Sequence, residues 1–417
     1  MKSLESSAQV DLTRHITLHV ATLKFFHVWF YIPHPKRSYK FWVAVFTRVV
    51  LGLLVFVIPP AAQFIYIIRL LASGKAEIQE VASTINLVLT ELLASFKLLD
   101  LRLRRDVLTQ LSGQLISGGL NCSETHKRIL EKGIKLSRRL FVGLLLGSGL
   151  DVFCHVVVVP ALRRFETLPV KMDFIFFDVN DPNYFGYVCA YQILYKPMVV
   201  AIYVVSQTIT WAFMGCADSQ LDVLINKLEN MKALVKITSA EKSCDENEAY
   251  GIIFKDCVLH HSAIIRFNKT MQEAFSGQLS MTLFVSACII GTTAVQIFSI
   301  ESPRKNITEV IWVLAYLSIF IANLFVECYF GNAITHKGLQ IGTVVFAGPW
   351  LGLPTKMKRN LVLFIAKAQQ PIVLTAAKLT PVSIQTFTTN LFPFFFRIMN
   401  IKIYFLIAFN CFVQSKG

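Results

Sequence analysis

The stretch YFGYVCAYQILYKPM, residues 184–198, opens an apolar run that continues to residue 212. A run of this length exceeds the ~17 residues that a helix needs to cross a bilayer. Its four tyrosines, Tyr184, Tyr187, Tyr191 and Tyr195, lie three or four positions apart, so in a helix they share one face. The stretch therefore predicts a membrane-spanning helix with an aromatic stripe.

The composition of the whole chain agrees with a membrane protein. Of 417 residues, 54% are hydrophobic, 12% aromatic and 16% charged, and the mean hydropathy is +0.55. These values lie outside the range of ordinary soluble domains. Windows of about 19 residues predict an all-α protein with six clear spans, at 43–69, 81–99, 140–160, 186–212, 277–299 and 310–334.

The C-terminal region predicts a seventh span. Residues 360–379, NLVLFIAKAQQPIVLTAAKL, carry Lys367, Gln369, Gln370 and Pro371 in their middle. Polar residues at membrane depth cost a few kcal/mol each. We therefore interpret 360–379 as an amphipathic cytoplasmic or interfacial helix, and we expect the final span to begin near residue 383.

The distribution of basic residues predicts the orientation. Residues 1–24 are polar and show no signal peptide, so we expect a cytosolic amino terminus. Lys and Arg concentrate in the segments that this orientation places inside, above all between Arg102 and Arg139. The positive-inside rule then predicts an extracellular carboxyl terminus after seven spans. Because these basic residues flank spans and no nucleic-acid-binding motif accompanies them, we expect no nucleic-acid partner.

The spans and their connections divide the chain into consecutive parts. The fourth span is predicted to continue as an amphipathic helix, followed by a polar loop at 238–247 and a helix at 248–275 that leads into the fifth span. We expect a cytosolic segment at 1–42, spans one to four at 43–212 and cytoplasmic helices at 213–275. Spans five and six follow at 276–335, a cytoplasmic anchor helix at 336–380, and the last span with its tail at 381–417.

No catalytic or metal-binding pattern is present in the sequence. GxSxG, Walker A and HExxH motifs are all missing. The nine cysteines are scattered, which is typical of packing residues rather than of disulfides or a metal site. His260 and His261 are adjacent, so in a helix they point to different faces. We expect no enzyme activity, no metal and no cofactor.

Ionisable residues inside the predicted spans are candidates for function, because each is costly at membrane depth. Asp151 and His155 lie one helical turn apart in the third span, Lys196 lies beside the tyrosine stripe, and Glu91 lies halfway along the second span. They form either a structural network in which Asp151, His155 and Lys196 neutralise one another, or the polar part of a ligand pocket, or a proton relay that includes Glu327.

The tyrosine stripe has two interpretations. An interfacial belt is the usual explanation for tyrosines at a membrane edge, and it suits Tyr184. Tyr187 to Tyr195 cover about 12 Å of helix, which is deeper than a belt requires. Tyr191 and Tyr195 therefore favour the wall of a cavity for small apolar molecules.

Residues 347–387 resemble the signature of insect odorant receptors. The shared features are a Trp followed by a Pro, a basic helix that ends in Gln-Pro, and a Ser-x-x-Thr-Phe entry to the last span, here Trp350, Pro354, Lys358, Arg359, Gln370, Pro371, Ser383, Thr386 and Phe387. The chain length, the seven spans, the acidic and aromatic loop sequence at 168–192 and Lys97 also fit this family.

The resemblance implies a ligand-gated cation channel, formed as a heterotetramer with a shared co-receptor in the plasma membrane of olfactory sensory neuron dendrites. It implies a tuning subunit that binds small volatile organic ligands and is surrounded by lipid. The family's pocket lies in the outer half of the subunit between the second, third, fourth and sixth spans. Carried onto this sequence, it comprises Val88, Ser148, Asp151, His155, Tyr191, Tyr195 and Tyr316.

The same resemblance implies a pore lined by the last span and cytoplasmic helices, including 356–377, that anchor the subunits. The pore candidates are Leu391, Phe394 and Phe395, and the anchor candidates are Trp350, Pro354, Gln370 and Pro371. The segment after Phe387 departs from the family pattern, because Pro393, Arg397 and Lys402 lie where a pore helix is expected.

Three other classes of membrane protein compete with this interpretation. A G-protein-coupled receptor shares the span count, but the acidic-Arg-Tyr and Asn-Pro-x-x-Tyr motifs are missing and the charge asymmetry predicts the opposite orientation. A gustatory-type receptor is disfavoured because this sequence lacks the Thr-Tyr and Gln-Phe ending of that class. A transporter built from repeats is disfavoured because no internal repeat is present.

Overall fold

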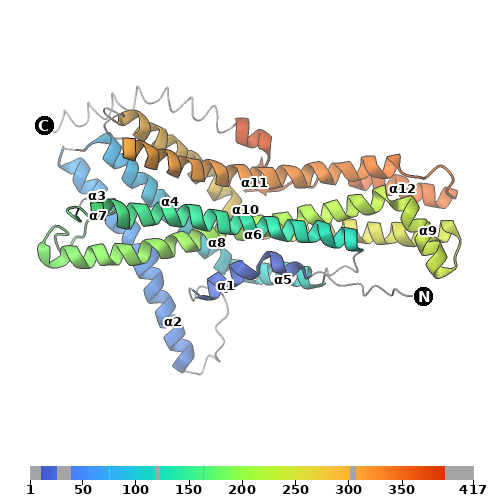
Figure 1. Ribbon diagram of the computed structural model, residues 1–417, viewed down its shortest axis with the longest axis horizontal. Helices are drawn as coiled ribbons and strands as arrows, with labels where there is room; N and C mark the ends of the chain where they lie inside the picture. Colours follow the sequence, from blue (N-terminus) through green and yellow to red (C-terminus); the bar gives the residue numbers. More distant parts are fainter. Residues whose placement is uncertain are drawn as a thin grey trace.

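The computed structural model describes residues 11–25, 39–74, 76–117, 123–162, 164–300 and 307–389. The described chain is almost entirely helical and forms an elongated bundle (Figure 1). Its first half contains a 3-10 turn, helices and two π turns, in chain order η1 (Leu12–His15), α1 (Thr17–Phe25), α2 (Tyr39–Gly52), the π turn η2 (Leu53–Val57), α3 (Ile58–Ala72), α4 (Ile78–Leu103), α5 (Arg105–Ser117), α6 (Glu124–Phe153), the π turn η3 (Cys154–Val158) and α7 (Val159–Leu162). The second half contains α8 (Pro182–Glu229), α9 (Met231–Lys242), α10 (Glu246–Ser299), α11 (Ile307–Ala347), α12 (Thr355–Ala368), β1 (Thr375–Ala376) and β2 (Thr380–Pro381).

Within the described residues, six stretches of helix are long and apolar enough to cross a membrane, which confirms the six predicted spans. They run over residues Phe41–Ala72, Ile78–Leu103, Glu124–Ala161, Pro182–Glu229, Glu246–Ser299 and Val310–Ala347. The first joins α2, η2 and α3, and the third joins α6, η3 and most of α7. The seventh predicted span begins as a helix at residue 384, and its remainder lies outside the described residues.

The longest helices extend well beyond a bilayer. α8 has 48 residues and α10 has 54, which correspond to about 70 and 80 Å against a hydrocarbon core of ~30 Å. Their continuations, together with α5, α9 and α12, form a second helical bundle at one end, on the right of Figure 1. The predicted continuation of the fourth span as a helix is confirmed.

Helix α8 lies at the centre of the molecule and packs against α4, α6, α10 and α11. Residues 201–217 of α8 are all buried, because neighbouring helices surround this part of the helix on every side. α2, by contrast, leans away from the bundle (Figure 1) and exposes Trp42 and Phe46. The buried α8 is therefore a core helix, whereas α2 presents an exposed apolar face that is suited to contact with lipid.

Two local predictions about the extramembrane helices are wrong. The polar segment 238–247 was expected to be a loop, but α9 continues to Lys242 and only three residues separate it from α10. The helix expected over 356–377 ends at Ala368, and an antiparallel pairing of β1 with β2 follows. Pro371 explains the second difference, since proline has no amide hydrogen and disfavours helical geometry in the residue before it.

The loop between α7 and α8 is packed rather than free. Val170 and Met172 are each 1% exposed, and the Gln192 side chain exchanges hydrogen bonds of 2.8 and 2.9 Å with the backbone of Val170. The Asp173 carboxylate lies 2.5 Å from the guanidinium of Arg69 on α3. The loop therefore ties α3 to α8 at the end of the bundle opposite α9 and α12.

Candidate ligand-binding pocket

A cavity of about 170 Å³ lies among α4, α6 with η3, α8 and α11, near the end of the bundle that carries α3 and α7. α10 adds one lining residue, Gln296. The four main helices correspond to the second, third, fourth and sixth spans. Most of the lining is apolar, and the aromatic part comes from Tyr203, Trp312, Tyr316 and Phe320.

The aromatic wall is built at helical spacing along α11. Trp312, Tyr316 and Phe320 lie four residues apart and so share a face. The rings of Tyr316 and Phe320 have centroids 5.0 Å apart, and Phe320 lies 6.1 Å from Tyr203 on α8. These separations are within the range of favourable aromatic contacts. The spacing is visible in the sequence, but Trp312, Phe320 and Tyr203 were not among the predicted pocket residues.

A buried ion pair joins α4 to α8 at the cavity. Lys196 Nζ lies 2.5 Å from Glu91 Oε1, and both residues line the cavity. The same oxygen accepts a hydrogen bond of 2.9 Å from Gln63 on α3 and a longer one of 3.4 Å from the Tyr195 hydroxyl. The expected mutual neutralisation of Asp151, His155 and Lys196 is therefore wrong, because Glu91 is the partner of Lys196.

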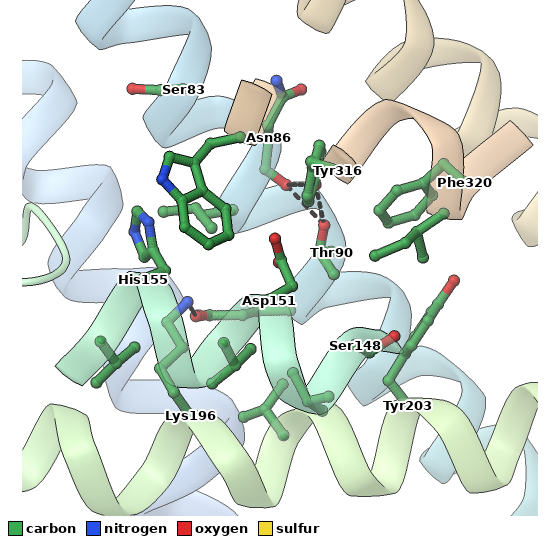
Figure 2. Close-up of a pocket in the computed structure, with 18 of the residues that line it drawn as sticks. Ser83, Asn86, Thr90, Ser148, Asp151, His155, Lys196, Tyr203, Tyr316 and Phe320 are labelled. Carbon is green, nitrogen blue, oxygen red and sulfur yellow. Dashed lines mark hydrogen bonds and ion pairs between the residues drawn. The ribbon is translucent and has the colours of Figure 1, made fainter. Parts of the chain in front are cut away.

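Asp151 and His155 both line the cavity, but the helix geometry changes between them. The π turn η3 begins at Cys154, and π turns occur frequently at functional sites. No hydrogen bond or ion pair to Asp151 or His155 is found in the described part of the chain. In Figure 2 the Asp151 carboxyl points from α6 into the cavity between His155 and Thr90.

A network of neutral polar groups closes another side of the cavity. The Tyr316 hydroxyl lies 2.6 Å from Thr90 Oγ1 and donates to the Asn86 carbonyl at 3.1 Å (Figure 2). The Asn86 side chain in turn donates to Thr293 on α10 at 3.1 Å. Asn86 and Thr90 were not predicted, although they lie four residues apart on the pocket face of α4. The network fixes α4, α10 and α11 relative to one another.

The predicted pocket residues divide into two groups. Ser148, Asp151, His155 and Tyr316 come together in this cavity. Val88, Tyr191 and Tyr195 are not among its lining residues.

The tyrosine stripe runs on a different side of α8. Tyr191 and Tyr195 pack on each other with centroids 4.9 Å apart, and the Tyr191 hydroxyl donates to the backbone carbonyl of Leu54 in η2. Tyr184 and Tyr187 are 47% and 79% exposed, so they do not belong to the core. Tyr191 therefore contacts the first span, and Tyr195 contacts the ion pair of Lys196 and Glu91 through its hydroxyl.

The predicted anchor residues lie away from the cavity, since none of them is among its lining residues. Trp350 donates from Nε1 to the carbonyl of Phe346 at 2.7 Å, Pro354 precedes the first residue of α12, and Gln370 and Pro371 are exposed beyond its end. The pore candidates Leu391, Phe394 and Phe395 lie outside the described residues.

The family model described as "7tm Odorant receptor" matches residues 77–391, about three quarters of the chain. The chain belongs to the odorant receptor family. The predicted all-α, multi-pass architecture and the family resemblance are confirmed, and as a member of a receptor family this chain is not an enzyme.

Individual members of the family are distant from this odorant receptor. Odorant receptor 22b of Drosophila melanogaster is 25% identical over 47% of this chain, and the match spans only about half, 46%, of that relative. Odorant receptor 22a of the same fly is 21% identical over 85% of this chain and 84% of its own length. Among solved structures, the olfactory receptor OR5 of Machilis hrabei in complex with eugenol superimposes with a TM-score of 0.72 at 14% identity, covering 94% of this chain and 98% of OR5.

Proposed function

We propose that this odorant receptor is a ligand-tuning subunit that binds small volatile organic molecules and gates a non-selective cation channel together with the odorant-receptor co-receptor. The observation that carries the proposal is the cavity between α4, α6, α8 and α11. Its surface is mostly apolar and includes four aromatic side chains, and nine polar or charged residues also line it. Ligand sites for small molecules commonly combine these features.

The solved relative supports the choice of ligand size. OR5 was solved with eugenol, a small aromatic molecule. A cavity of about 170 Å³ is slightly larger than the roughly 150 Å³ of an engineered apolar cavity that holds benzene. We therefore expect ligands of one ring or a short chain. The candidates Val88, Tyr191 and Tyr195 act indirectly in this proposal, by holding the cavity walls.

The proposed channel assembly uses surfaces outside the pocket. α12 exposes Val362 and Leu363 at 64% and 63%, and exposed apolar side chains on an extramembrane helix indicate a protein contact. We propose that this helix, with Trp350, Pro354, Gln370 and Pro371, anchors the subunits in the cytoplasm. The last span, with Leu391, Phe394 and Phe395, lines the pore in this proposal.

The proposed orientation has a cytosolic amino terminus, an extracellular carboxyl terminus and the cavity in the outer half of the plasma membrane. An acceptor site for N-glycosylation introduced in the loop between α7 and α8 should be modified. An acceptor site in the three residues between α9 and α10 should stay unmodified. The reverse pattern would contradict the cytosolic amino terminus that is proposed for the channel subunit, and it would favour a G-protein-coupled receptor.

The function is tested by recording odorant-evoked currents from cells that express this receptor with and without the co-receptor. We expect currents only with both subunits present. Trp312→Ala, which alters the cavity wall, should change the order of ligand potencies. Trp42→Ala is the matched control, because Trp42 is 64% exposed on α2, and it should leave that order unchanged. Equal profiles for both variants and the wild type would contradict the assigned cavity.

A further inference from the structure

Among the described residues that line the cavity, the charged side chains do not balance. Two carboxylates, Glu91 and Asp151, face one ammonium group, Lys196. With both carboxylates ionised and His155 neutral, the described part of the lining carries one excess negative charge. An uncompensated charge at membrane depth is costly, and such groups pair with one another, face water or mark a binding site.

Glu91 is only partly satisfied by its protein partners. The Lys196 ammonium and the Gln63 amide both donate to Oε1, at 2.5 and 2.9 Å. The second oxygen, Oε2, is buried and has no hydrogen-bond partner among the described residues. Glu91 is 1% exposed, so this oxygen is a buried acceptor without a donor among the described residues.

Asp151 is the carboxylate for which the described residues supply no counter-ion. No ion pair or hydrogen bond reaches it within the described part of the chain. Figure 2 shows its carboxyl directed into the cavity, whereas the Lys196 ammonium is engaged elsewhere. A positively charged ligand would supply the missing charge and up to three N–H donors, where an alcohol supplies one O–H.

The walls opposite α6 also suit a cation. Trp312, Tyr316 and Phe320 lie at helical spacing on α11 and line the same cavity as Asp151. Aromatic faces attract ammonium groups, and this attraction is strongest when water is excluded. The cavity volume of about 170 Å³ limits the ligand to roughly one ring with a short substituent.

We propose that the cavity binds a small protonated organic amine, with its ammonium group at Asp151 and its apolar part against the aromatic wall of α11. This inference rests on the proposed function, because it names the ligand class of the same pocket. The alternative is a neutral ligand that accepts a hydrogen bond from a protonated Asp151. The two alternatives predict different changes in binding affinity when the amine is replaced by an alcohol of the same shape.

The test is binding of benzylamine and benzyl alcohol to the purified full-length receptor in lipid nanodiscs, measured by calorimetry at pH 7 with empty nanodiscs subtracted. We expect the wild type to bind benzylamine at least about tenfold more tightly than the alcohol, as for a hydrogen-bonded ion pair. Asp151→Asn should abolish this preference and change alcohol binding by less than about threefold. Asp178→Asn is the matched control, since Asp178 is an exposed loop carboxylate, and it should keep the preference.

Equal or tighter binding of the alcohol by the wild type would overturn the proposal, as would an unchanged preference in Asp151→Asn. If Asp151→Asn does not fold, the wild-type ratio and Asp151→Glu decide, because Asp151→Glu retains the charge and should retain the preference. Current recordings separate the two levels of inference. Responses to neutral odorants but not to benzylamine would reject the amine and leave the channel intact. Asp151-dependent amine binding without any odorant-evoked current would support the site and reject the channel.

Discussion

Lys196 on α8 donates a hydrogen bond of 2.5 Å to Glu91 on α4, and the two side chains are only 7% and 2% exposed. Because Gln63 on α3 donates to the same carboxylate at 2.9 Å, three helices meet at this oxygen. The pair lies at the wall of the cavity, so it contributes both to the packing of the spans and to the polarity of the pocket.

Removing the charge of Glu91 should destabilise the receptor. Glu91→Gln leaves the Lys196 ammonium buried without a counter-ion, and breaking such a pair costs about 3 to 5 kcal/mol. We expect a clear fall in the thermal unfolding temperature of the purified receptor. The double variant Glu91→Gln with Lys196→Met should recover much of this loss, since the unpaired Lys196 ammonium is removed as well.

The exposed pair Arg105–Asp106 provides the matched control. Its atoms are 3.5 Å apart and its side chains are 63% and 91% exposed, so Asp106→Asn should have little effect, as is usual for surface ion pairs. Similar losses from Asp106→Asn and Glu91→Gln would show that burial does not determine the effect.

Tyr191→Phe should loosen the first span. The Tyr191 hydroxyl donates to the carbonyl of Leu54, which lies in the π turn η2. Without that donor a backbone carbonyl at membrane depth loses its side-chain partner, at a cost of about 1 to 3 kcal/mol. The change should appear as a lower unfolding temperature. Tyr187→Phe is the matched control, and because Tyr187 is 79% exposed it should be neutral.

Gly331→Ala should disrupt the entry to the last span. A Cβ at Gly331 on α11 would overlap the carbonyl oxygen of Val382, directly before the helix that begins at residue 384. Forcing these segments apart should cost about 1 to 3 kcal/mol and reduce ligand-evoked current and thermal stability. Gly149→Ala, where nothing lies within 4 Å, should retain both. Unchanged current and thermal stability in Gly331→Ala would contradict this prediction, because they would show that α11 and Val382 can move apart at little cost.

Stability should fall under mildly acidic conditions because of buried histidines near the amino terminus. Burial lowers the pKa of His15 and of His19 to about 4, against about 6.5 in an unfolded chain. As the pH drops below about 6.5, the unfolded state takes up protons that the folded state does not, so the stability present above this pH is progressively lost.

Unfolding temperatures of the purified receptor between pH 7.5 and 5 test this expectation. His15→Asn removes one titrating group while retaining an amide for the contact with Ser137, which lies 3.0 Å from His15 Nδ1. We expect a shallower acid slope for this variant and a still shallower one when His19 is also replaced. Slopes parallel to the wild type would contradict the assignment.

Much of the fold was predictable because the signal is local. Six apolar runs of sufficient length predicted six spans, since every backbone group in lipid must be bonded within its own helix. The helix ends outside the membrane were less predictable. The polar composition of residues 238–242 indicated a loop, yet they complete α9, which is terminated only by Ser243 in the left-handed conformation typical of a helix C-terminus.

The pocket was predictable only in part, for a geometric reason. Asp151 and His155 were identified because charged residues in an apolar run are conspicuous, and the family resemblance added Ser148 and Tyr316. Trp312 and Phe320 were missed because aromatic residues in an apolar helix carry no signal that distinguishes a cavity wall from plain packing. Tyr191 was assigned to the pocket because it shares a helix face with the other tyrosines. Helical periodicity defines such a face but does not show which neighbouring helix the face contacts.

The membrane spans, the helical class, the lack of known catalytic motifs and the family can be predicted from the sequence alone, because these depend on composition, length and short motifs. Only the folded chain shows that Glu91, and not Asp151, pairs with Lys196, and that Asp151 faces the cavity with no counter-ion among the described residues. Such pairings depend on how α4, α6 and α8 are rotated against one another. That rotation is set by the packing of all the helices together, which no single segment of the sequence specifies.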